Sequence, residues 1–235
     1  KFLNHYLEMF GPLINENGGF IDKFIGDAIM ALFPGKNVSS ADDSLHAAVA
    51  MGKELCSYNI QRVKSVKEAI AIGIGIHLGR LRLGTIGFKD RIETTVIGDT
   101  VNLASRVEGL TKQYGLTALF TSHVLEKLKK PELFHTREVD TVKVKGKDIP
   151  VTIHEAYNHD SVEMFDKKEK LSDRYGEALS MFKKREWKDA LKLFSEFQKE
   201  LPEDRVVQIY ADRCLNLLEN PPDDSWSHIS TLTEK

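Results

Sequence analysis

The sequence predicts an α+β domain built on a mixed β-sheet, followed by a small all-α tail of helical-hairpin type. Helical and strand patterns alternate through residues 1–157, as expected where helices pack against a sheet. The tail, residues 172–235, has helical periodicity up to residue 219 and no strand pattern. Between them, residues 158–171 are polar and charged, which is typical of a linker.

The composition excludes several classes of protein. With 41% hydrophobic and 29% charged residues, the chain has the make-up of an ordered globular protein. Its net charge of −2 argues against a nucleic-acid-binding protein, which needs a basic surface. Apolar runs are far shorter than the roughly 20 residues that span a bilayer, so no membrane segment is expected. The isolated Cys56 and Cys214 favour free thiols and a cytoplasmic location.

The first elements are expected to be a helix, a β-hairpin and a second helix. Residues 1–14 have helical spacing, and residues 20–25 and 28–33 are rich in β-branched and aromatic side chains around a Gly26-Asp27 turn. Ser40 is the expected cap of the second helix, with Asp43 three residues later. The expected buried positions of that helix are Leu45, Ala48, Val49, Leu55 and Cys56.

The remaining elements complete the sheet. We expect strands at 69–78, 81–86, 94–97 and 118–121, helices at 100–114 and 122–128, and a closing hairpin of residues 142–145 and 151–157. The helix at 100–114 should bury Leu103, Val107, Leu110 and Tyr114.

The tail resembles a helix–turn–helix repeat. Ala178, Ala190, Phe194 and Pro202 lie at spacings like those of a repeat of about 34 residues. The tail holds about one and a half such units, and about three are needed for stability. It is therefore expected to pack on the first domain, on another copy or on a protein partner.

Two segments carry polar residues suited to chemistry. Asp27, at a hairpin tip, could hold Mg²⁺, although aspartate also simply favours turns, and Lys23 alone is an ordinary surface lysine. Asn102 and Arg106 are four residues apart and share a helix face, so they could orient a ribose and neutralise phosphate charge. In isolation, the simpler interpretation of Arg106 is favoured, a surface arginine that pairs with a nearby acid such as Glu108.

Three further residues have simple alternatives. Asp99 could merely cap the helix that follows it. Lys145, beside Gly146 in a hairpin, could reach a triphosphate or be part of a charged turn. His77 lies on a largely buried strand and is expected to be structural.

Together these segments resemble one family, the class III nucleotide cyclase catalytic domain. GGFIDKFIGDAIMALF, AIGIGIHLG, TVIGDTVNLASRVEGL and VKGK occur in that family's order and spacing, within residues 1–157. The resemblance implies a ferredoxin-like palm that dimerises head to tail, with active sites at the homodimer interface. It implies conversion of ATP to 3′,5′-cyclic AMP and pyrophosphate with two Mg²⁺ or Mn²⁺ ions.

The resemblance also implies roles for seven residues. Asp27 matches one of two metal aspartates, Asn102 the ribose-orienting residue and Arg106 the transition-state arginine. The matching base-recognition pair is Lys23 and Thr95, and the matching phosphate contacts are Lys145 and Arg91, the latter in the loop after Gly87. A lysine only donates hydrogen bonds, which suits adenine N1 and argues against a guanylate cyclase.

The front of the chain departs from the family pattern. The family's first strand carries the other metal aspartate, and no residue before Asp27 matches it. We therefore expect the palm to lack its first strand and this chain to be inactive alone. The alternative is a degenerate cyclase domain that serves as a dimerisation scaffold, with a helical tail that binds a partner.

Overall fold

The computed structural model describes residues 2–88, 91–143 and 149–231 of the 235-residue chain. Its strands form two hairpins and one larger sheet. One hairpin pairs β1 (Phe20–Ile25) with β2 (Ala28–Leu32), and the other pairs β4 (Arg82–Phe88) with β5 (Arg91–Ile97). The larger sheet has five strands, in the order β3 (Ile74–Ile76), β6 (Ala118–Thr121), β8 (Val151–Ala156), β7 (Thr136–Lys143) and β9 (Ser230–Thr231). The sheet is mixed, as the sequence predicts, because β3–β6 and β7–β9 are parallel and the other neighbours antiparallel.

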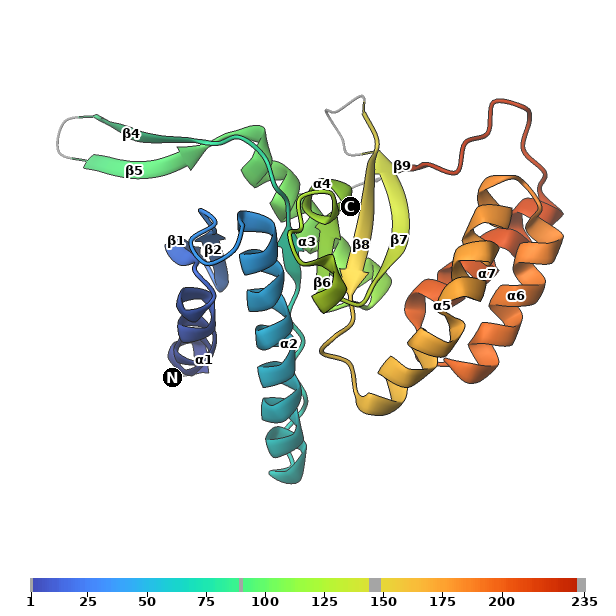
Figure 1. Ribbon diagram of the computed structural model, residues 1–235, viewed down its shortest axis with the longest axis horizontal. Coiled ribbons are helices and arrows are strands. Elements are labelled where there is room, and N and C mark those ends of the chain that lie inside the picture. The colour runs from blue at the N-terminus through green and yellow to red at the C-terminus, as the bar shows by residue number, and fades with distance from the viewer. Residues whose placement is uncertain (1, 89–90, 144–148, 232–235) are drawn as a thin grey trace.

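Seven α-helices surround these strands in the described part of the chain. They are α1 (Phe2–Glu16), α2 (Ser40–Lys64), α3 (Asp99–Tyr114), α4 (Ser122–Leu125), α5 (Val162–Lys183), α6 (Trp187–Glu200) and α7 (Arg205–Glu219). Figure 1 shows α5–α7 together beside β7, and the β4–β5 hairpin reaching away from the rest of the chain. None of the described helices is long and apolar enough to cross a membrane.

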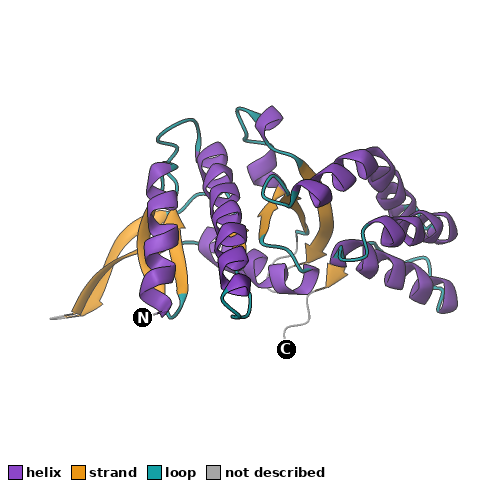
Figure 2. Ribbon diagram, turned by 90° about the horizontal axis from the view of Figure 1, so that it is seen from below, coloured by secondary structure: helices purple, strands orange, loops and turns teal. Residues whose placement is uncertain are grey.

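The five-stranded sheet is covered on both faces because successive strand residues point to opposite sides. In β6, Leu119 packs in a cluster with α3 and the tail, whereas Phe120 packs in a cluster with α2. Figures 1 and 2 both show α2 between the β1–β2 hairpin and this sheet. The four predicted inward positions of α3 are all buried: Leu103, Val107, Leu110 and Tyr114.

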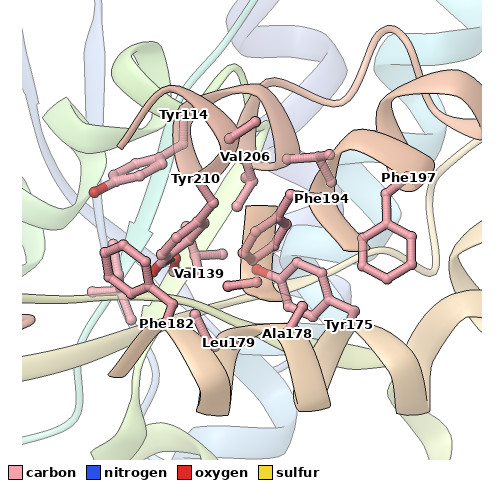
Figure 3. Packing of buried hydrophobic residues seen from close by; sticks show 14 of the residues in the cluster. Tyr114, Val139, Tyr175, Ala178, Leu179, Phe182, Phe194, Phe197, Val206 and Tyr210 are labelled. Atoms are coloured by element: carbon pink, nitrogen blue, oxygen red, sulfur yellow. Dashed lines mark hydrogen bonds between the residues drawn. The ribbon is translucent and has the colours of Figure 1, made fainter. Parts of the chain in front are cut away.

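The tail packs on the first domain, one of the three arrangements that its short length allowed. A single cluster of buried side chains includes Leu103 and Tyr114 from α3, Val139 from β7, and residues of α5, α6 and α7. Figure 3 shows part of this cluster, with Tyr114 and Val139 next to side chains of the tail. Phe194 and Tyr210 stack at the centre, with ring centroids 5.1 Å apart. Residues 162–219 therefore share their core with α3 and the sheet.

The start of α2 corrects two details of the sequence prediction. Its cap is Ser39 rather than Ser40, because the Ser39 hydroxyl accepts from the backbone N–H of Asp42 at 3.2 Å. Asp43, the expected capping partner, instead accepts from the backbone N–H groups of Asn37 and Val38. Cys56, expected in the buried stripe, is exposed.

Several boundaries also differ from the prediction. The segment expected as a linker, 158–171, is helical from Val162, where Ser161 caps α5 by accepting from the backbone N–H of Met164. The strand expected at 69–78 pairs only over Ile74–Ile76. The hairpin expected to close the domain begins earlier, since β7 starts at Thr136.

Candidate active site

The β1–β2 hairpin holds Asp27 at its tip, as predicted. Gly26 has a φ of +64°, a left-handed conformation that glycine adopts readily and that a tight two-residue hairpin turn needs at its first position. The Asp27 side chain is exposed, and so are its neighbours Phe24 and Ile25, at 53% and 58%. The tip thus presents one carboxylate beside two uncovered apolar side chains.

Lys23 lies on β1 next to an irregularity in the pairing. The register with β2 shifts between Ile21 and Lys23, which places Asp22 at a bulge. The Lys23 ammonium lies 3.6 Å from the Asp22 carboxylate, whose side chain is 8% exposed. The Lys23 side chain itself is 31% exposed, so it can still meet a ligand from outside the strand.

Helix α3 holds Asn102 and Arg106 one turn apart, on the side of the helix away from its buried stripe. Asn102 is exposed and Arg106 is half-buried. The first turn is tied down by Thr100, whose hydroxyl donates to the Arg80 carbonyl at 2.8 Å. Asp99 is the first residue of α3 and not its cap, since Gly98 occupies the cap position. An amide and a guanidinium on one rigid helix can orient a ribose and neutralise phosphate charge.

Two glycines let α3 lie directly on β3. A Cβ on Gly75 would stand 2.2 Å from the backbone nitrogen of Glu108 and 2.3 Å from the carbonyl oxygen of Ala104. A Cβ on Gly73 would stand 2.3 Å from the Thr111 hydroxyl. The middle of α3 is therefore held against the strand at a distance that no side chain at position 75 permits.

Replacing Gly75 with Ala is expected to destabilise the chain by about 1–3 kcal/mol, because α3 must move away from the strand. Gly109→Ala is the matched control, since a Cβ there meets nothing within 4 Å and alanine favours a helix. Urea denaturation should show a lower midpoint for Gly75→Ala and an equal or higher one for Gly109→Ala. Equal midpoints for Gly75→Ala and wild type would contradict the close-packing argument.

The remaining predicted site residues are placed only in part. Thr95 and Arg91 belong to β5, opposite Gly84 and Phe88, and their side chains lie outside the described part of the structure. Arg91 is thus in a strand and not in a loop as expected. Lys145 falls in the segment 144–148, outside the described residues. His77 makes a 2.8 Å hydrogen bond to the Thr121 hydroxyl, consistent with a structural role.

The described residues fall into two groups on different elements, Lys23 with Asp27 on the hairpin and Asn102 with Arg106 on α3. Burial, together with the charges of Asp27 and Glu108, raises the pKa of Tyr6, so Tyr6 of α1 lies within electrostatic range of the hairpin tip and of Glu108 on α3. A single exposed carboxylate fits the way Mg²⁺ is held, through one or two carboxylates and substrate phosphates. Among the described residues, no three His, Cys, Asp or Glu side chains are grouped as metal ligands.

Comparison with known proteins gives consistent matches. The chain is 52% identical to an adenylate cyclase of Anabaena cylindrica over 160 residues, 66% of this chain and 31% of that protein. It is 36% identical to the terminal-differentiation-specific adenylate cyclase of Dictyostelium discoideum over 216 residues, 91% of this chain and 10% of that protein. The chain thus spans a third or less of these relatives.

A solved structure agrees with the fold. The adenylyl cyclase CyaB from P. aeruginosa superposes with a TM-score of 0.55 at 28% identity, over 66% of this chain and 79% of that one. The family model of the adenylate and guanylate cyclase catalytic domain matches residues 1–158. That match covers the β1–β2 hairpin, which carries Lys23 and Asp27, and helix α3, which carries Asn102 and Arg106. The chain therefore belongs to the adenylate and guanylate cyclase catalytic domain family.

Proposed function

We propose that the chain is the catalytic part of an adenylate cyclase, which converts ATP to 3′,5′-cyclic AMP and pyrophosphate. The observation that carries the proposal is that Asn102 and Arg106 share one face of α3, a helix whose Ala104 and Glu108 backbone packs against β3 within the family's matched region. The 3′-oxygen of the ribose forms a bond to the α-phosphorus and loses its proton to solvent. The bond from the α-phosphorus to the bridging oxygen breaks, and pyrophosphate leaves.

Arg106 and Asn102 have distinct tasks in this proposal. The guanidinium of Arg106 donates to the α-phosphate as negative charge develops on its oxygens, where such contacts count most. Asn102 donates and accepts hydrogen bonds, so its amide can fix the ribose with the 3′-hydroxyl in line. Both act from one helix, so their spacing is set by the helix and not by flexible loops.

The proposed metal site uses Asp27. Its exposed carboxylate would contact divalent ions, Mg²⁺ or Mn²⁺, together with the triphosphate. When bound, two such ions supply charge neutralisation and lower the pKa of the attacking hydroxyl. Lys145 and Arg91 would contact the phosphates, and we propose that a second metal carboxylate comes from outside these 235 residues. The edge position of β3 and the separate β1–β2 ladder support this, because a further strand could pair with them.

Base selection would rest on Lys23 and Thr95. The ammonium of Lys23 donates to adenine N1, and the hydroxyl of Thr95 can accept from the 6-amino group. Guanine carries a hydrogen on N1, so both guanine N1 and the Lys23 ammonium are donors and no hydrogen bond can form between them. ATP is therefore the proposed substrate over GTP.

The proposed site is shared between two copies of the chain. The uncovered Phe24 and Ile25 beside Asp27 are the kind of surface that a partner covers. In a head-to-tail dimer, Asp27 of one copy faces Asn102 and Arg106 of the other. Lys23 and Asp27, although four residues apart, then serve different sites.

The test is complementation between two inactive variants, in the chain together with any residues that its gene encodes before Lys1. Asp27→Ala and Arg106→Ala should each lower cyclic AMP formation from ATP with Mn²⁺ far below one quarter of the wild-type rate. When they are co-refolded in equal amounts, random pairing restores one intact site in half of the dimers, or about one quarter of wild-type activity. EDTA should remove that activity.

The control is a mixture of Asp27→Ala with Asp27→Asn, which cannot rebuild a site in any pairing. Activity in the Asp27→Ala and Arg106→Ala mixture that stays at the level of each variant alone would contradict the shared site. A folded wild-type dimer that makes no cyclic nucleotide from ATP or GTP would contradict the proposed function and favour the scaffold alternative.

A further inference from the structure

A buried carboxylate joins the helical tail to α3. Asp140, 1% exposed, follows an irregularity in the β7–β8 register after Glu138. One of its oxygens accepts from the Tyr114 hydroxyl at 2.5 Å and from the Ser230 hydroxyl at 2.7 Å. The same oxygen forms an ion pair with the Arg213 guanidinium at 2.8 Å. Three elements remote in sequence, α3, α7 and β9, thus meet on one side chain of β7.

The α3 side of this contact is the last residue of the helix. Burial and the adjacent Asp140 carboxylate raise the pKa of Tyr114, so its hydroxyl stays protonated and donates. Arg106 precedes Tyr114 by eight residues, about 12 Å along the axis of a rigid helix. A shift of α3 at Tyr114 is therefore carried to Arg106 and Asn102.

The tail side is equally constrained. Arg205, at the start of α7, packs against Gly115, where an added Cβ would lie 3.0 Å from the Arg205 Cβ. Tyr210, one turn before Arg213 on α7, donates to the Val139 carbonyl at 3.0 Å. Figure 3 shows Tyr114, Tyr210 and Val139 gathered at this junction. Two points on α7 thus fix its position against α3 and β7.

The comparison with relatives agrees with a joined unit. Similarity to the Dictyostelium discoideum adenylate cyclase covers 216 residues, more than the 158 residues of the family match, so it continues into the tail. The tail is part of what this chain shares with that protein.

We propose that Asp140, Tyr114 and Arg213 are positioning residues for the cyclase reaction, through which the helical tail holds α3 so that Arg106 and Asn102 meet the nucleotide. This rests on the proposed function. None of the three touches substrate; they act by fixing the C-terminal end of the catalytic helix. Misplacement of a reacting group by about 1 Å can lower a rate by about 100-fold, so small shifts matter.

The experiment compares Tyr114→Phe with Lys183→Met, each made in the chain together with any residues that its gene encodes before Lys1. Tyr114→Phe keeps the buried ring and removes only the hydroxyl. Lys183→Met breaks another contact between the tail and β7, the 2.6 Å ion pair of Lys183 with Glu138, which does not involve α3. We expect kcat to fall about 10-fold in Tyr114→Phe with KM for ATP changed less than about twofold, and both constants to stay within about twofold in Lys183→Met.

Amide hydrogen exchange supplies a readout independent of activity. Exchange over the last two turns of α3 should be faster in Tyr114→Phe and in Arg213→Met, and unchanged in Lys183→Met. Unchanged exchange in Tyr114→Phe, or equal losses of kcat in Tyr114→Phe and Lys183→Met, would overturn the proposal. If the wild type makes no cyclic nucleotide, the proposed function fails, and the exchange comparison alone decides whether the tail restrains α3.

Discussion

Replacing Arg137 with Met is expected to destabilise the folded chain by about 3–5 kcal/mol at neutral pH, because it removes the guanidinium that pairs with two buried carboxylates. Arg137 lies on β7 with a side chain only 9% exposed. It makes a hydrogen bond to Asp204 at 3.0 Å, an ion-pair contact to the other Asp204 oxygen at 2.6 Å and a hydrogen bond to Glu155. Its guanidinium lies 4.9 Å from the centre of the Tyr175 ring. Neither carboxylate is accessible to water, so the lost charge cannot be replaced by solvent.

The difference in the free energy of unfolding between the wild type and Arg137→Met should become smaller as the pH is lowered from 7 to 5. In the wild type, burial raises the pKa of Glu155 and Asp204, but the charge and hydrogen bonds of Arg137, together with the charge of Lys168, hold both pKa values below their usual range. Their contribution to stability is therefore present above the unfolded-state pKa values and is lost as the pH falls through the folded-state values. Without Arg137, burial dominates, and both groups take up protons at a higher pH.

Arg174→Met is the matched control for that measurement. Arg174 also pairs with a glutamate, Glu196, and also lies over an aromatic ring, 5.4 Å from the centre of Phe197. Its side chain is 44% exposed, so its loss should cost no more than about 1 kcal/mol. Equal shifts of the urea midpoint in the two variants would contradict the assignment of Arg137 as a buried link.

Replacing Arg106 with Ala is expected to lower kcat by roughly 10²–10³-fold, the typical cost of removing a transition-state hydrogen-bond donor. KM for ATP should change far less, since the contact strengthens as charge develops on the α-phosphate. Arg106→Lys keeps the charge but loses the planar fork of donors, so its kcat should lie between those of the wild type and Arg106→Ala.

Lys112→Ala provides the control on the same helix. Lys112 is an exposed cation in the last turn of α3, away from Asn102 and Arg106. Its loss should leave kcat and the urea midpoint nearly unchanged. If Arg106→Ala and Lys112→Ala had the same kinetic constants, Arg106 would act only through surface charge and not as a catalytic residue.

Local patterns were enough to predict much of the fold. The β1–β2 hairpin follows from β-branched residues on both sides of Gly26, whose positive φ the turn needs. All four predicted buried positions of α3 are buried, because apolar residues that repeat every 3.6 positions lie on a single face of the helix, and that face packs on the sheet. The prediction of a mixed sheet was likewise confirmed, since it contains both parallel and antiparallel neighbours.

Long-range contacts explain what the sequence patterns missed. Residues 162–171 look like a linker because most are polar, yet Lys168 is buried in α5, where it pairs with Glu155 at 3.2 Å and Asp160 at 2.7 Å. No local pattern reveals partners supplied by another element. Asp140 was missed for the same reason, since a lone aspartate in a strand carries no motif.

The candidate site was predicted by motif rather than by geometry. The position of Asn102 and Arg106 on one helix face is confirmed. Nothing in the local pattern shows that Gly75 is the residue that allows α3 to approach β3 so closely. The roles of Lys23 and Thr95 in choosing the base stay predictions, which substrate competition between ATP and GTP can test.

The common core of the tail and the sheet sets where the gene can be divided. A fragment that stops at residue 158, the end of the family match, would leave Tyr114, Val139 and their neighbours facing water where α5 and α7 now cover them. Such a fragment should aggregate unless another protein covers the exposed apolar side chains. A lack of cyclase activity in this fragment would therefore reflect a failure to fold. For the same reason, the tail cannot be exchanged between relatives unless the residues of α3 and β7 that contact it are exchanged as well.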